Sequence, residues 1–211
     1  MENPHIIPTT EHNTMILAGT GQVTAVPDLT ILRLGFQTSG ENLVEAQNEN
    51  ARISQAVLRS LQQLGITDIR TYEYNINKIY EYEDNKQIDK GYSVRNILEI
   101  RTNNLDQVGY VIDTAVYYGA NIVDLIEFRI SDKEAYYLQA LNLAIENAII
   151  KADSIAKNLG LLNPPSPIRI IEIGTTPVPT RLLGSREAAY TTPIEPGSKQ
   201  IEANVNIEFI Y

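Results

Sequence analysis

Two hydrophobic periodicities alternate along the chain, and together they predict an α+β fold. Apolar residues at every second position indicate strands, and apolar residues spaced by three or four positions indicate helices. The first pattern predicts strands over residues 15–26, 29–38, 69–82, 91–101, 122–130, 168–173 and 201–209. The second pattern predicts helices over residues 41–64, 104–118 and 131–160.

Short polar residues and glycines predict where the helices begin and end. Ser39 is the expected cap of the first helix, and Gly65 is expected to end it in the left-handed conformation. Ser131 and Glu134 match the S-x-x-E capping box and are expected to open the long helix. The buried stripe predicted for that helix comprises Ala135, Leu138, Ile145, Ala148, Ala152, Ile155 and Leu159.

The order of elements predicts a single domain over residues 15–211, preceded by a tail over residues 1–14. Residues 29–130 follow the order β-α-β-β-α-β of a ferredoxin-like, split β-α-β core. The strands at 69–82 and 91–101 are predicted to form a hairpin around an acidic loop. The last strand is apolar on alternate positions only, which is typical of a strand buried on one face. We therefore expect a mostly antiparallel sheet, with extra strands beside the core and the three helices packed on one face.

Gly19 and Gly21 lie in the first strand and resemble the start of a dinucleotide-binding fingerprint. Thr24 replaces the third glycine, and the strand pattern continues where the fingerprint requires a helix. The glycines are better explained by a bulge or by a close approach of another backbone.

The amino-acid composition excludes several kinds of catalytic and metal-binding site. The 211 residues include no cysteine, so disulfides, thiolate nucleophiles and cysteine-ligated metals are impossible. The two histidines, His5 and His12, both lie in the expected N-terminal tail. No nucleophile motif is present, so we expect a protein that is not an enzyme and that binds no cofactor or metal. A carboxylate pair or a Ser–Lys pair assembled by the fold is the alternative.

Charge and hydropathy bear on partners and location. The net charge of −9 and the scattered Lys and Arg residues argue against nucleic acid as a partner. No apolar run approaches the roughly 18 residues of a membrane span. The N-terminal residues have neither the basic nor the apolar region of a signal peptide. A cytoplasmic location is therefore expected, with export and removal of a signal as the alternative.

Two regions are candidates for an interaction surface. The strand at 69–82 carries tyrosines at alternate positions, including Tyr72 and Tyr74, and these suit sheet packing, a protein interface or a ligand platform. Residues 175–198 form an unusually long, proline-rich connection, and such loops are usually functional or disordered. We expect this loop to dock on a neighbouring subunit or a partner through Val178, Leu182, Leu183 and Tyr190.

A series of short motifs resembles the SIMPL-domain family, a bacterial domain of unknown function. Residues 17–28, LAGTGQVTAVPD, are similar to the family's opening G-x-G-x-V-x-A-x-P-D. Residues 147–151 depart from the more charged sequence that is usual there. Further similar segments lie at 46–50, 65–66, 69–71, 91–92, 119–121, 128–132 and 140–160, so that the resemblance covers about residues 15–211.

The resemblance implies a general role but carries no catalytic residues over to this chain. Some family members are exported to the cell envelope, some are associated with oxidative-stress defence, and some form large homo-oligomers. A eukaryotic member binds a signalling kinase. We therefore expect a non-enzymatic protein that forms homo-oligomers and binds a protein partner, with a stress-protective role. A small-ligand-binding protein, or an enzyme with a carboxylate-based site, is the alternative.

Overall fold

A computed structural model describes residues 13–174 and 192–211, which divide between two compact units. The terminal unit draws on Met1–Ala25, Asp132–Arg181 and Ser198–Tyr211, and the central unit on Val26–Ser131 and Leu182–Gly197. Each unit has its own antiparallel sheet and its own helical cover, so the predicted α+β class is confirmed. The assignment of residues 15–211 to a single domain stays a prediction.

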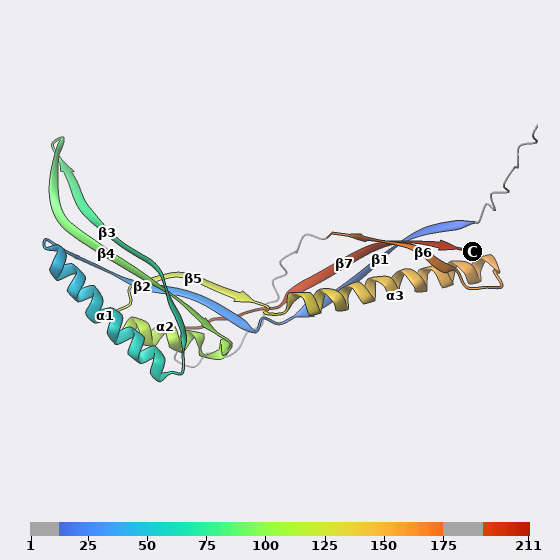
Figure 1. The fold of residues 1–211 in the computed structure, drawn as a ribbon, viewed down its shortest axis with the longest axis horizontal. Coiled ribbons are helices and arrows are strands. Elements are labelled where there is room, and N and C mark those ends of the chain that lie inside the picture. Colours follow the sequence, from blue (N-terminus) through green and yellow to red (C-terminus); the bar gives the residue numbers. More distant parts are fainter. Residues whose placement is uncertain (1–12, 175–191) are drawn as a thin grey trace, which may run out of the picture. The chain divides into compact units, whose positions relative to one another are not determined.

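The central unit contains a four-stranded sheet. Its strands are β2 (Leu29–Gly40), β3 (Asp68–Glu83), β4 (Lys86–Thr102) and β5 (Ile122–Arg129), in the order β3-β4-β2-β5 with antiparallel neighbours (Figure 1). The predicted pairing of β3 with β4 is confirmed, and β5 lies beside β2. The broader ferredoxin-like description stays a prediction.

Two helices cover one face of this sheet. They are α1 (Leu43–Gln63) and α2 (Val108–Tyr117), the latter preceded by the 3-10 turn η1 (Leu105–Gln107). Alternate residues of β2 and β4 point toward the helices and are buried. The core includes Leu32, Leu34, Phe36, Leu98 and Ile100 from the strands and Val57, Leu61, Val108 and Val111 from the helices.

Of the helix ends of the central unit, the end of α1 matches the prediction. Gly65 follows α1 with φ +80°, as expected. At the start of the helix predicted over residues 104–118, the Asn104 and Gln107 side chains are joined by a hydrogen bond at 3.3 Å, but neither side chain caps η1 or α2. The first cap, however, is Asn42, whose side chain accepts a hydrogen bond from the Val44 N–H, and not Ser39. Ser39 is still paired with β4, so the strand continues beyond the predicted cap.

The acidic loop predicted over residues 83–89 is instead mostly strand. Asp84 and Asn85 alone form the turn, with φ values of 48° and 60°. Asp and Asn tolerate this left-handed region better than most residues, and two such residues match the twist of a hairpin. The hairpin extends past the last residue of β2, Gly40, which pairs with Tyr92 (Figure 1).

The terminal unit contains a three-stranded sheet and the long helix α3 (Lys133–Leu159). Its strands are β1 (Thr14–Ala25), β6 (Ser166–Ile173) and β7 (Lys199–Ile210), in the order β1-β7-β6. The prediction of one sheet with three helices on one face is therefore wrong. β7 pairs with β1 over twelve residues, which creates a second sheet with an apolar face for α3 to cover. The core joins Ala140, Ala144, Ala148 and Ala152 to Ala203, Val205, Ile207 and Phe209.

The buried stripe of α3 consists of alanines, which corrects the predicted stripe. Ala152 is buried as expected, but Leu138 and Leu159 are exposed and Ile145 is only partly buried. The reason lies in the strand beneath. A Cβ atom on Gly19 would lie 2.0 Å from the Ala144 carbonyl oxygen. Only small residues on both sides allow the helix to approach so closely, and the expected close backbone approach at this glycine is confirmed.

The start of α3 is also one residue later than predicted. Asp132 caps the helix, with its side chain accepting a hydrogen bond from the Ala135 N–H at 2.9 Å. Ser131 instead belongs to the central unit, where its N–H and hydroxyl both donate to the Asp28 carboxylate. The capping box fails here because the serine already has a partner from a distant part of the chain.

Candidate interaction surface

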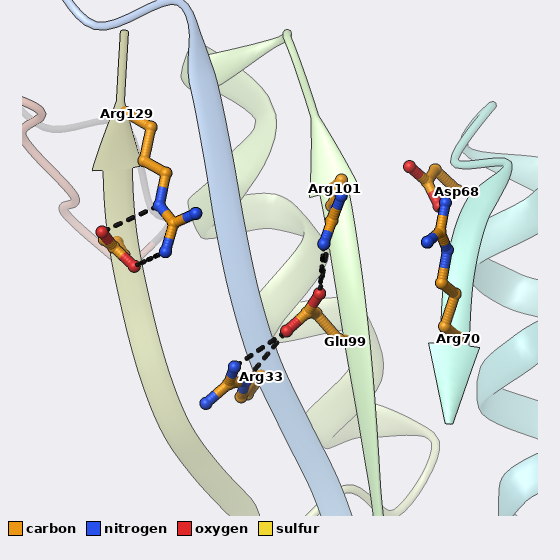
Figure 2. Close-up of polar contacts among 7 residues, drawn as sticks. Arg33, Asp68, Arg70, Glu99, Arg101 and Arg129 are labelled. Carbon is orange, nitrogen blue, oxygen red and sulfur yellow. Dashed lines mark hydrogen bonds and ion pairs between the residues drawn. The ribbon is translucent and has the colours of Figure 1, made fainter. Parts of the chain in front are cut away.

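The face of the four-stranded sheet turned away from α1 and α2 carries charged side chains. Alternation along β4 directs Leu98 and Ile100 to the core and Glu99 and Arg101 to the opposite face. Arg33 of β2 is in register with Glu99. Figure 2 shows Glu99 between two arginines, 2.9 Å from Arg33 and 2.9 Å from Arg101.

Every arginine on this charged face has a carboxylate partner. Further pairs join Arg70 to Asp68 at 3.1 Å and Arg129 to Glu127 at 2.8 Å (Figure 2). Arg95 lies 3.4 Å from Glu73 and 3.6 Å from Asp124. Because the charges compensate one another locally, this face suits a partner with its own alternating charges better than it suits a polyanion.

Glu99 is the most enclosed carboxylate of the charged face, with 12% of its side chain exposed. Hydrogen bonds from Arg101 and then Arg33 lower the pKa of the Glu99 carboxyl. A carboxylate held in the ionised form is a hydrogen-bond acceptor and not a proton donor at neutral pH. Its arrangement therefore supports pairing and positioning of the two arginines, and does not resemble a general acid.

Stability should depend on pH through this carboxylate. A lowered folded-state pKa stabilises the protein above the unfolded value, about 4.3 for Glu, and this stabilisation is lost as the pH falls through the folded pKa. Glu99→Gln should lower the free energy of unfolding by about 2 kcal/mol at pH 7. The difference from the unsubstituted protein should narrow below pH ~4. Urea titrations at several pH values measure it, with the exposed Glu146→Gln as the control.

The two tyrosines predicted as interaction residues lie on opposite sides of the sheet. Tyr72 lies in a β-bulge on the charged face, with the Arg33 guanidinium carbon 3.6 Å from the centre of its ring. Tyr74 pairs with Asn96 of β4. Asn96 lies on the same face of β4 as the buried residues Val94 and Leu98, so Tyr74 is on the face that α1 and α2 cover. The bulge therefore divides the predicted stripe. The loop residues Val178, Leu182, Leu183 and Tyr190 lie outside the described residues.

A second candidate surface is the outer edge of the three-stranded sheet, formed by β6. All eight residues of β6 are exposed, including Ile168, Ile170, Ile171 and Ile173. The sequence predicts a strand at 168–173, but it does not reveal that this strand forms an edge. The run of isoleucines lacks the strict alternation of a strand with one buried face, and that irregularity was the available signal.

The opposite edge of the same sheet, β1, is covered by α3. The Lys151 ammonium donates to the Ala18 carbonyl at 2.7 Å, and the Asn147 side chain accepts from the Thr20 N–H at 3.3 Å. These residues lie in the segment that departs from the usual family sequence. They satisfy backbone groups that a further strand would need, which leaves β6 as the more open edge of this sheet.

Two absences hold for the described residues, 13–174 and 192–211. Within these residues, no cluster of three or more His, Asp or Glu side chains is placed to hold a metal ion. None of the helices described there is both long and apolar enough to span a membrane.

These features define an α+β protein with two helix-covered antiparallel sheets, a compensated charged face and an open, isoleucine-rich edge strand. The chain belongs to the SIMPL family, whose model, described as a protein of unknown function (DUF541), matches residues 15–209. The resemblance seen in the sequence motifs is thus confirmed.

Three relatives illustrate the range of similarity. The 26 kDa periplasmic immunogenic protein of Brucella melitensis is 29% identical, over 95% of this chain and 86% of its own length. The uncharacterized protein YggE of Escherichia coli K12 is 27% identical, over 74% of this chain and 60% of its own length. YggE of Edwardsiella ictaluri is 26% identical, over 90% of this chain and 78% of its own length.

Proposed function

We propose that this protein is non-enzymatic and acts through self-association and partner binding, with the β6 edge as the contact between copies. The observation that carries the proposal is that all eight residues of β6, an edge strand of the three-stranded sheet, are exposed. An edge strand presents unpaired N–H and C=O groups that another strand can satisfy. Four isoleucines add apolar area that a second copy would bury.

The covered β1 edge supports a closed assembly over an open-ended one. If both edges were free, sheets could add in succession and form a fibre. Because Lys151 and Asn147 occupy backbone groups of β1, pairing through this sheet favours β6 with β6, and a two-fold axis then closes the contact. The bulge between Pro167 and Arg169 restricts which partner strands fit. Larger assemblies would use a second surface, and the charged face is the candidate.

Light scattering after size separation tests this proposal. The unsubstituted chain should run as an assembly of at least two copies of 23.6 kDa. Replacing both Ile171 and Ile173 with lysine should lower the particle mass about twofold, because two like charges would face each other across the contact. Ile16→Lys, at an isoleucine of the opposite edge strand that is more exposed than Ile171 or Ile173, is the control and should leave the mass unchanged. A single-chain mass for the unsubstituted protein at micromolar concentration would overturn the proposal.

Location and physiological role extend the same proposal. The Brucella relative is named a periplasmic protein, which supports the exported alternative and not the cytoplasmic expectation. We therefore propose a periplasmic location. Fractionation of cells that express the natural gene would test this location. Stress protection rests on the family resemblance. To test it, the chromosomal gene is deleted and the cells are complemented with either the natural gene or the β6 double variant. Survival of the two strains under peroxide is then compared.

A further inference from the structure

A pocket of about 380 Å³ lies in the central unit between α2 and the last turn of α1. This volume falls at the lower end of the range for pockets that bind small molecules. Three of the lining residues are tyrosines and one is an aspartate. The lining comprises Ser60, Gln63 and Leu64 from the end of α1 and Tyr110, Asp113, Thr114, Tyr117 and Tyr118 from α2 and its cap.

Aromatic rings form much of the wall of this pocket. The Tyr117 and Tyr118 rings are nearly perpendicular, at 87°, with their centres 5.2 Å apart. Two rings at a right angle present faces in two directions, and Tyr110 adds a third ring about two turns earlier on α2. The face of an aromatic ring carries partial negative charge and attracts cations. Such a corner of rings suits an alkylated ammonium group.

Asp113 supplies the formal charge of the pocket. Among the described residues that line the pocket, it is the only charged one, and none of them is Lys or Arg. Thr192 holds the carboxylate through two donors, its N–H at 3.0 Å and its hydroxyl at 2.5 Å. Both donors are neutral, so they orient the carboxylate without cancelling its negative charge.

The end of α1 adds to the negative potential. The last carbonyl groups of a helix carry partial negative charge, which a basic residue in the last turn commonly offsets. Neither α1 nor α2 has a basic residue in its last turn. The Leu64 carbonyl accepts a hydrogen bond from the neutral side-chain amide of Gln107, at 3.2 Å. Rings, carboxylate and helix end thus all favour a cation and disfavour an anion.

We propose that this pocket binds a small organic cation with an alkylated ammonium group of about the size of choline. The tyrosine rings surround the alkyl groups of the ammonium, and Asp113 provides the countercharge. This binding site is separate from the β6 contact, and neither proposal depends on the other.

Titration with choline, followed by the tyrosine ring signals in NMR spectra, tests the site. The uncharged probe 3,3-dimethyl-1-butanol has the same shape and lacks only the charge. Choline should give saturable shifts and bind the full chain at least about fivefold more tightly than this alcohol. Tyr117→Leu and Asp113→Asn should each weaken choline binding by about fivefold or more.

Tyr117 is 83% exposed, so its replacement should not disturb folding, and Tyr82→Leu, at 72% exposure on the β3–β4 hairpin, is the matched control. The control should bind choline as the unsubstituted protein does. Equal binding of choline and the alcohol would reduce the site to an apolar groove and overturn the proposal. Absence of saturable shifts, or unchanged binding by Tyr117→Leu, would overturn it as well.

Discussion

Replacing Gly19 with alanine is expected to destabilise the protein by about 3 kcal/mol, the upper part of the range for overpacked cores. The added methyl group would lie 2.0 Å from the Ala144 carbonyl oxygen and 3.0 Å from the Ala148 Cβ. A backbone oxygen cannot rotate away as a flexible side chain can. The helix would have to move off the sheet, which would loosen the contact between the α3 alanines and β7. Urea denaturation measures the loss.

Gly174→Ala is the matched control, because a Cβ there would meet nothing within 4 Å. It should change the stability by less than about 0.5 kcal/mol. Gly21→Ala should repeat the Gly19 result, since its added carbon would lie 2.0 Å from the Ala140 carbonyl oxygen. A loss below about 1 kcal/mol at both glycines would mean that α3 and β1 are not in close backbone contact.

Replacing Asn50 with leucine is also expected to cost about 3 kcal/mol, through unsatisfied polar groups and not through volume. Asn50 is buried on the inner face of α1. Its amide nitrogen donates to the Phe36 carbonyl at 3.3 Å and the Val94 carbonyl at 3.0 Å, which belong to β2 and β4. Leucine is similar in size but has no donor, so both interactions would be lost.

Asn48 provides the comparison, because it lies on the exposed side of the same helix. Asn48→Leu should leave the free energy of unfolding within about 0.5 kcal/mol of the original. Hydrogen exchange of the β2 and β4 amides gives a second readout, with faster exchange expected for the Asn50 variant alone. Equal stability of the two variants would show that the Asn50 amide contributes no net stabilisation.

Local patterns in the sequence predict most elements of this protein. The strands and helices lie close to their predicted positions, because period-two and period-3.6 burial follow directly from backbone geometry. β7 illustrates this: Ala203, Val205, Ile207 and Phe209 are all buried, as their alternation indicates. Gly65 ends α1 in the left-handed conformation for an equally local reason, the absence of a Cβ.

The errors occur where a distant partner competes with the local signal. Ser131 matches a helix cap, yet its donors go to Asp28, which is 103 residues away. Leu138 and Leu159 are the larger apolar residues of the α3 pattern, yet alanines face the sheet because Gly19 and Gly21 bring the helix too close for leucine. Size complementarity across an interface cannot be read from one of its two sides.

The candidate surfaces divide in the same way. The sequence by itself determined that the chain has no cysteine and that its two histidines are His5 and His12, near the N-terminus. It also determined that apolar residues alternate along β7 and that the chain resembles the SIMPL family. Only the tertiary structure decided that β6 is an exposed edge, that a bulge separates Tyr72 from Tyr74, and that Tyr110, Tyr117 and Asp113 share a pocket with the end of α1. The physical reason is that strand order, register and helix packing depend on contacts between residues far apart in the chain, which local periodicity does not encode.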